Sequence, residues 1–411
     1  MFCFIFCDRY LTGQHRVLYE PSDLTIQIIA RHWKFAQTPL DTSKTASALY
    51  VMLDPGHPRL VEYIRSSGLE SSTSQIIFKI LIGISPTTQS SKQQRAKTLM
   101  ATFSEHLIRL TGRSAAEELD FLNSVISTSA SEPELAKIFH TSTPLWNAMF
   151  RLLKKSAKTT PTDQGSGTTE ENELMHRQRV ISNIVGTSAN TLHDLSLKNQ
   201  QECGPLVRIW GNENLLGALE EVIEILVKIP GMTSAFFVFC SLFMQTNAII
   251  LVQLTRLAMI IELTITEGPP SLLGIFRTQF PRWRILGTLL RHDLARQQIS
   301  GPPPVPISNV VAPRDSHFWD HSVWQCFASL QFKCIDKSKC AKRGCENEGI
   351  IVCMCQSTKY CSEACKTKCV LFIHFTFCIR FLVVELTIFI FFLINQGCEG
   401  PYACMWLDGG I

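Results

Sequence analysis

The sequence predicts a mainly α protein in which a helical array or bundle precedes a small cysteine-rich module near the C-terminus. Over much of residues 94–299, apolar side chains recur every three or four positions with polar side chains between them, which is the pattern of amphipathic helices. Apolar residues make up 45% of the 411 residues and charged residues 18%, so these helices have enough apolar surface to pack a core. Eight of the sixteen cysteines fall between Cys334 and Cys369, and this density marks the separate module.

The N-terminal region, residues 1–93, has no pattern that fixes its structure. Residues 24–35 have helical spacing, whereas 48–53 and 76–84 are short apolar runs that suit either strands or short helices. The apolar run at the start ends at Asp8 and is too short for a secretory signal peptide. We therefore expect an intracellular protein, in the nucleus or cytoplasm, where clustered cysteines bind metal more often than they form disulfides.

The region 94–299 is expected to be α-helical, interrupted by a flexible loop at 156–172 that is rich in Thr, Ser, Gly and Pro. The clearest helix is 214–229, with Asn212 as its expected N-cap and Pro230 after its last turn. Each such helix has a single apolar stripe and must pack against neighbours. No repeat of fixed period is visible, so the pattern is compatible with both a bundle and a solenoid.

Two later segments differ from these amphipathic helices. Residues 235–263 are apolar on all sides; a buried helix pair is the favoured interpretation and a membrane span the alternative. Residues 300–315 hold several prolines, which is typical of a stiff, extended linker. The next segment, 316–332, has aromatic and aliphatic side chains at helical spacing and leads into the cysteine-rich module. Helix and module together are bounded at 316–378, with the core of the module at 340–365.

Three pairs of cysteines stand in this core. They are Cys340 and Cys345, Cys353 and Cys355, and Cys361 and Cys365. Zinc takes four tetrahedral ligands and prefers thiolate sulfur, and two ligands close in sequence can reach one ion through a tight turn. Two pairs complete one site, so three pairs exceed the need of one ion. The economical solution is two zinc ions with interleaved pairs, which makes the fold class a helical array or bundle with a small C-terminal zinc-stabilised finger.

The motif Cys355-Gln-Ser-Thr-Lys-Tyr-Cys361-Ser-Glu-Ala-Cys365 resembles the MYND-type zinc finger. That family has a cysteine, five residues ending in an aromatic one, and then Cys-Ser-x-x-Cys. The wider spacing of Cys340 and Cys345 is similar to the first pair in many fungal members. A long helical region ahead of such a finger is also similar to fungal proteins of this type. The resemblance at motif level is confined to the cysteine-rich module.

This resemblance implies that the cysteine pairs bind metal crosswise. The first zinc would be held by Cys340, Cys345, Cys361 and Cys365. The second would be held by Cys353, Cys355, His374 and Cys378. The second set departs from the family: one residue instead of two separates its first two cysteines, and the His-x-x-x-Cys stretch comes about one residue late, without the usual tryptophan before it. Cys369 is a rival ligand. A complete finger would bind two zinc ions, and a finger with an incomplete second site would bind one.

Residues 370–395 form a long apolar stretch in which His374, Arg380 and Glu385 are the ionisable residues. Its 26 residues are enough to span a bilayer, so a membrane anchor is one interpretation. A buried or interfacial helix is a second, and non-native sequence, such as a retained intron, is a third. We favour the third, because the stretch begins where the family resemblance ends and because charges in mid-membrane are costly.

The expected function follows from the zinc chemistry and the resemblance. A closed four-ligand site has no open position for water, so we expect structural zinc and no enzymatic activity. The resemblance implies an adaptor that binds protein partners, in particular proline-containing peptides. A net charge of only +4 argues against a nucleic-acid partner. The alternatives are a membrane-tethered adaptor that uses 370–395 and a fragment of a SET/MYND-type lysine methyltransferase, although only 46 residues follow Cys365.

Overall fold

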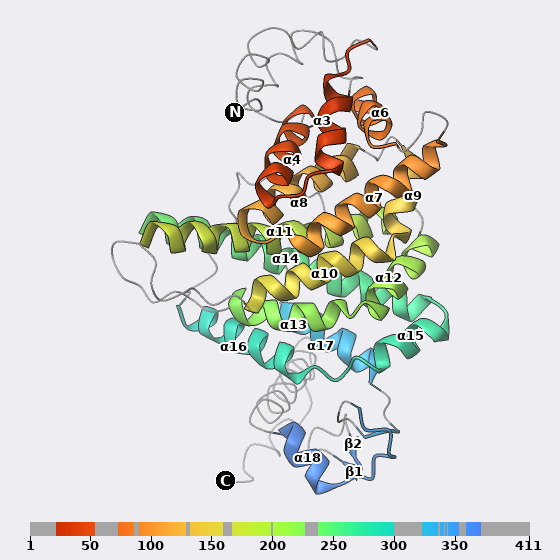
Figure 1. The fold of residues 1–411 in the computed structure, drawn as a ribbon. Helices are drawn as coiled ribbons and strands as arrows, with labels where there is room; N and C mark the ends of the chain where they lie inside the picture. The colour runs from red at the N-terminus through yellow and green to blue at the C-terminus, as the bar shows by residue number, and fades with distance from the viewer. Residues whose placement is uncertain are drawn as a thin grey trace, which may run out of the picture.

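Helices dominate the structure, and the mainly α prediction is confirmed (Figure 1). The computed structural model describes residues 22–53, 73–85, 90–128, 132–158, 167–198, 200–226, 237–299, 323–335, 338–340, 342, 344–352 and 359–370. These residues form fifteen α-helices, one short 3-10 helix and one two-stranded sheet.

The elements run in this order along the chain. The first half comprises α3 (Thr25–Lys34), α4 (Pro39–Leu53), α6 (Thr73–Gly83), α7 (Lys92–Arg109), α8 (Gly112–Thr128), α9 (Pro133–Thr141), α10 (Thr143–Lys158), α11 (Gly167–Lys198) and η2 (Gln200–Glu202). The second half comprises α12 (Cys203–Asn212), α13 (Leu215–Leu226), α14 (Phe237–Glu267), α15 (Pro270–Arg277), α16 (Trp283–Ile299), α17 (Val323–Cys334), β1 (Ile351–Val352), β2 (Lys359–Tyr360) and α18 (Glu363–Val370).

From α7 to α17 the helices stack in three rows, and each row takes every third helix (Figure 1). One row is α7, α10, α13 and α16, and the second is α8, α11, α14 and α17. The short helices α9, α12 and α15 form the third. The array is therefore a solenoid of three-helix units, in which each unit buries its apolar faces against the next. The units begin at uneven intervals, because the first row starts at Lys92, Thr143, Leu215 and Trp283. This irregularity is why no fixed period is visible in the sequence.

The helices α3, α4 and α6 cover the first end of the array. All three contribute to the same hydrophobic core as the later units, and α4 packs on α8 while α6 packs on α7. The short apolar runs at 48–53 and 76–84 are thus helical and contain no strand. The first of them is the end of a longer helix that begins at Pro39. Its start is marked by Thr38, whose hydroxyl accepts a hydrogen bond of 3.1 Å from the backbone N–H of Asp41 and donates one of 2.6 Å to the Asp41 carboxylate.

The N-cap predicted for the 214–229 helix is wrong by two residues. Asn212 is the last residue of α12, and the turn between α12 and α13 is made by Asn214, which has a positive φ of 59°. The Oδ1 atom of Asn214 accepts a hydrogen bond of 3.2 Å from the backbone N–H of Gly217. A Cβ on Gly217 would lie 2.3 Å from the Asn214 side chain, so this cap requires glycine at that position. The loop expected at 156–172 is also shorter, because α10 continues to Lys158 and α11 begins at Gly167.

The described part of the apolar stretch 235–263, from Phe237 onward, belongs to a single continuous helix, α14, and not to a helix pair. Its segment Thr246–Glu267 is long and apolar enough to cross a membrane, and no other segment among the described residues meets this test. The segment is also 61% buried within the protein, where α14 lies between α11 and α17. This packing is what a core helix of the array requires. The predicted apolar stretch 370–395 lies outside the described residues.

The last helix of the array, α17, leads into the cysteine-rich module. Trp324, Phe327 and Leu330 are buried against the array, in particular on α14. Cys326 and Cys334 are buried in the same core, and burial raises their pKa values to about 11 and about 12. The linker predicted at 300–315 and the start of the 316–332 helix lie outside the part of the chain that the structure describes.

Candidate metal centre

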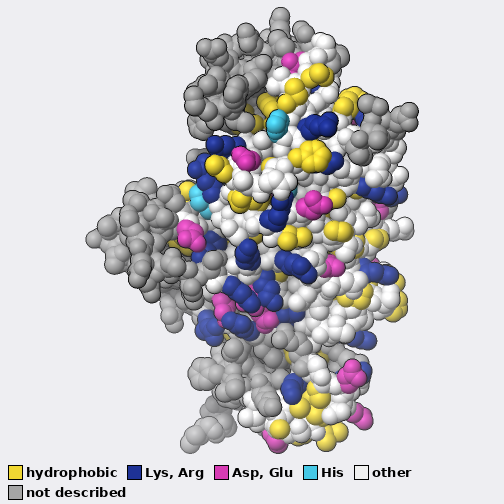
Figure 2. Space-filling model, viewed as in Figure 1, with side chains coloured by type: hydrophobic (Ala, Val, Ile, Leu, Met, Phe, Trp, Pro, Cys, Tyr) yellow, Lys and Arg dark blue, Asp and Glu magenta, His cyan; other side chains and the backbone are white. Residues whose placement is uncertain are grey.

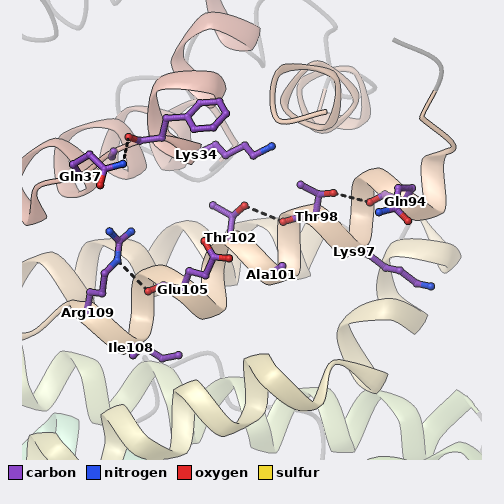
Figure 3. Close-up of a pocket in the computed structure, with 12 residues that line it drawn as sticks. Lys34, Gln37, Gln94, Lys97, Thr98, Ala101, Thr102, Glu105, Ile108 and Arg109 are labelled. Carbon is purple, nitrogen blue, oxygen red and sulfur yellow. Dashed lines mark hydrogen bonds between the residues drawn. The ribbon is translucent and has the colours of Figure 1, made fainter. Parts of the chain in front are cut away.

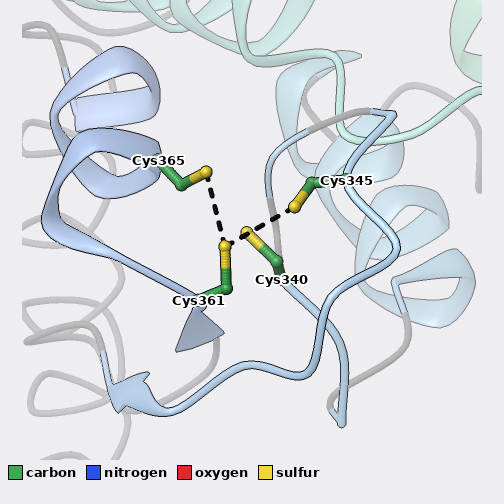
Figure 4. Close-up of side chains that lie close together, drawn as sticks. All are labelled: Cys340, Cys345, Cys361 and Cys365. Carbon is green, nitrogen blue, oxygen red and sulfur yellow. Dashed lines mark hydrogen bonds between the residues drawn. The ribbon is translucent and has the colours of Figure 1, made fainter.

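The first cysteine pair stands on a loop that returns on itself. The backbone N–H of Cys340 donates a hydrogen bond of 2.9 Å to the carbonyl of Asn347, and the N–H of Cys345 donates one of 3.0 Å to the carbonyl of Lys342. Between them Gly344 has a φ of +78°, a conformation that glycine adopts without steric cost. The turn at Gly344 therefore brings the thiols of Cys340 and Cys345 to the same side of the loop (Figure 4).

The second pair stands at a strand-to-helix junction. Cys361 follows β2 directly, and Cys365 lies in the first turn of α18. The hydroxyl of Ser362 accepts a hydrogen bond of 3.2 Å from the backbone N–H of Cys365, so Ser362 is the N-cap of α18. This cap turns the chain through one helical turn and places the second thiol beside the first.

Backbone pairing joins the two halves of the module. β1 and β2 are antiparallel, with Ile351 opposite Tyr360, and Cys340 forms a further bridge with Lys359. The strands approach closely at Gly349, where a Cβ would lie 2.5 Å from the Cβ of Lys359. The Tyr360 ring is fully buried beneath the cysteines, as expected for a packing residue. The loop that carries Cys340 is thus fixed against the strand that carries Cys361.

The four Sγ atoms converge on a common centre (Figure 4). All lie within 4.8 Å of one another. Sγ of Cys361 is 3.6 Å from Sγ of Cys345 and 3.5 Å from Sγ of Cys365. These thiols are free and not joined in disulfides. A tetrahedral ion with metal–sulfur bonds of about 2.3 Å separates its sulfurs by about 3.8 Å, close to the two shorter distances here. The four cysteines form a group that could hold a metal ion.

The electrostatics of the group favour a thiolate at Cys361. The neighbouring thiols of Cys365 and Cys345 lower the pKa of Cys361 to about 7. The side-chain amide of Asn347 adds a donor 3.8 Å from the same sulfur. Burial raises the pKa of the Cys340 thiol, so that position holds its proton more firmly until a cation displaces it. Metal ligation requires deprotonated sulfur, and the lowered pKa favours this state at Cys361.

The structure brings together the four cysteines predicted for the first metal site, from stretches that are well separated in sequence. Cys353, Cys355, His374 and Cys378, predicted for the second site, lie outside the described residues, as does the side chain of Cys369. Asn347 and Gly349 were not predicted as parts of the site. The sequence offers no local signal for either, because each acts through contacts across the module. Ser362 does have a signal, since a serine three residues before Cys365 suits an N-cap.

Comparisons with known proteins find no match: no protein-family model, no curated protein and no solved structure is similar to this chain at a significant level.

Proposed function

We propose that this chain is a zinc-dependent adaptor, in which a helical solenoid carries a MYND-like finger that binds protein partners. The convergence of four cysteine sulfurs within 4.8 Å carries the proposal. Four thiolates in a tetrahedral arrangement are a donor set that selects zinc over hard cations such as magnesium or calcium. Four protein ligands leave no open position on the ion. The zinc would therefore be structural, and we propose no enzymatic activity for the finger.

Zinc would supply most of the folding energy of the finger. Among the described residues of the module, Cys340 and Tyr360 are the buried members of the hydrophobic cluster, with Cys345, Ile351, Cys361 and Cys365 packed at its edge. A cluster this small cannot offset the entropy of ordering the module. Structural zinc in small fingers contributes about 10–16 kcal/mol. The finger would thus be folded with zinc and unfolded without it.

The finger has an apolar surface that suits a partner. Ile350 and Val352 are 72% and 52% exposed, and they stand two positions apart at β1, so they share one face of the strand. Hydrophobic side chains gather on the described part of the finger in Figure 2. Among the described residues β1 pairs with β2 on one side only, and its other edge is of the kind that can accept an extended peptide. These features support the capture of proline-containing peptides that the MYND resemblance implies, because such peptides are already extended.

The test has two parts, both on the full-length chain. Elemental analysis after metal-free dialysis should find one zinc ion per chain if the four described cysteines form the working site, and two if the second predicted site is also complete. A fluorescent proline-containing peptide should bind the zinc-loaded chain and be released by a chelator. The variant Val352→Asp should lose the peptide while keeping its zinc. The control Lys366→Ala, in α18, should keep both the peptide and the zinc. A chain without bound zinc, or equal capture before and after chelation, would contradict the proposal.

A further inference from the structure

A groove of about 760 Å³ lies between the end of α3 and the exposed face of α7 (Figure 3). These two helices stand at the N-terminal end of the array (Figure 1). α3 contributes Lys34 and the residues just after it. α7 contributes side chains over nearly its whole length, including Lys97, Glu105 and Arg109. In Figure 3 Lys34 extends from α3, and Glu105 and Arg109 extend from α7 toward the space between the two helices.

The groove has an excess of positive charge. Its lining includes Lys34, Lys97 and Arg109, against one carboxylate, Glu105. Lys34 donates a hydrogen bond of 2.8 Å to the carbonyl of Ile84, and Arg109 donates one of 3.3 Å to the carbonyl of Glu105. Both contacts use backbone oxygens, which carry no formal charge. The Lys34 ammonium also lies 5.1 Å from the centroid of the Phe35 ring, and Arg109 interacts electrostatically with the buried carboxyl of Glu118. Among the described residues, none of these three cations forms an ion pair with a carboxylate.

Two large apolar side chains accompany the cations. Phe35 is 58% exposed and Ile108 is 54% exposed, and both line the groove. The hydroxyls of Thr98 and Thr102 donate to carbonyls one turn earlier in α7, at 3.0 and 2.9 Å, so they offer a ligand little free hydrogen-bonding capacity. Hydrophobic and basic side chains are interspersed over α3 and α7 in Figure 2. Such a surface suits a ligand with both acidic and apolar groups.

A buried hydrogen-bond network holds the two helices that form the walls of the groove. Trp33, next to Lys34, donates from Nε1 to both carboxylate oxygens of Glu118 on α8, at 3.1 and 3.0 Å. His106, next to Glu105, lies with Nδ1 2.9 Å from the same carboxylate. All three side chains are fully buried. This network fixes α3 and α7 relative to each other, and a preformed groove loses less entropy when it binds a ligand.

We propose that this groove binds an acidic segment of a partner protein, with carboxylates on Lys34, Lys97 and Arg109 and an aromatic or aliphatic anchor on Phe35 and Ile108. Charge complementarity fixes the sign of the partner. The apolar rim favours a peptide over a nucleic acid, whose phosphate backbone would gain nothing from Phe35 and Ile108. The groove belongs to the array and uses no part of the finger, so this binding goes beyond the proposed function and requires no zinc.

The experiment starts with peptide display on the full-length chain, in the presence of a chelator, followed by fluorescence anisotropy with the most enriched peptide. Enriched peptides should combine two or more acidic residues with an aromatic or aliphatic one. The variant F35S/K97E should weaken binding by on the order of 10-fold or more, since it removes the anchor contact and reverses one charge. The matched control K137E/F78S changes an exposed lysine on α9 and a similarly exposed phenylalanine on α6, and it should bind as wild type.

Circular dichroism melts of both variants verify that the array is folded. Enrichment of neutral or basic peptides would overturn the proposal, and so would equal loss of binding in the two variants. A 20-nucleotide DNA that binds more tightly than the peptide, in a manner that depends on Lys97, would also overturn it. Because the chelator is present throughout, this experiment tests the groove independently of zinc. A negative result for the groove therefore does not bear on the proposed finger, and a negative result for the finger does not bear on the groove.

Discussion

Loss of the metal should unfold the finger and leave the array intact. The perturbation is either chelation or the variant Cys365→Ala in the full-length chain. Full burial of a large side chain such as Tyr360 stabilises by about 1.5–3 kcal/mol, whereas ordering each residue costs roughly 1–2 kcal/mol. The burial of Tyr360 thus offsets the ordering of only a few residues. Without the contribution of about 10–16 kcal/mol that zinc would make, the described residues of the finger have no other comparable source of stability.

The array has such a source. Its hydrophobic core runs continuously from Ile26 to Cys334 and includes whole faces of α7, α10, α11 and α14. Hydrogen exchange measured by mass spectrometry separates the two regions within one molecule. Peptides from residues 338–370 should lose all protection after chelation or in Cys365→Ala, while peptides from α10, α11 and α14 keep theirs.

The control for the variant is Lys366→Ala, which removes only an exposed ion pair of 3.1 Å with Glu363, a contact worth about 0–1 kcal/mol. It should leave exchange unchanged in both regions. If the finger kept its protection without metal, the reasoning that metal holds it together would be refuted. If the array lost protection together with the finger, the separation of the two stabilities would be refuted.

Three further predictions concern Glu118 and Gly349. Glu118→Ala should destabilise the array by roughly 3–5 kcal/mol in a urea melt, because it leaves the Trp33 N–H and His106 without their shared buried partner; a loss below 1 kcal/mol would contradict the network. Burial raises the pKa of Glu118, so the folded protein holds this proton more firmly than the unfolded chain does. The resulting stabilisation is complete below the unfolded pKa of about 4.3 and is lost as pH rises through the folded pKa. Relative to Glu118→Gln, wild type should therefore lose stability as pH rises above about 4.3. Gly349→Ala should weaken zinc binding measured by competition with a chromophoric chelator, because its Cβ would lie 2.5 Å from that of Lys359; unchanged affinity would show that the strands can separate without cost to the site.

Several amphipathic helices between residues 94 and 229 and the first cysteine set were predictable because both depend on local pattern. Amphipathic spacing marks each helix by itself, and two spaced cysteine pairs mark a metal site wherever the chain brings them together. The arrangement of the helices in rows was not predictable. The three-helix units begin at uneven intervals, and the sequence of an apolar stripe does not specify which helix packs against it. The cap at Asn214 was missed for a similar reason. Its role depends on a positive φ and on the absence of a Cβ at Gly217, and both follow from how α12 meets α13.

The groove on α3 and α7 was not predicted because it depends on which side chains the folded protein leaves exposed. In sequence, Phe35 and Ile108 look like core residues, and only the packed structure leaves them outside. Their exposure beside Lys34, Lys97 and Arg109 has a consequence for how the two proposed binding surfaces relate. In the proposed function the finger would be held by metal, whereas the groove is held by the buried carboxyl group of Glu118. Conditions that remove zinc should therefore abolish one surface without altering the other, so that a partner bound through both would lose one contact and remain tethered by the second.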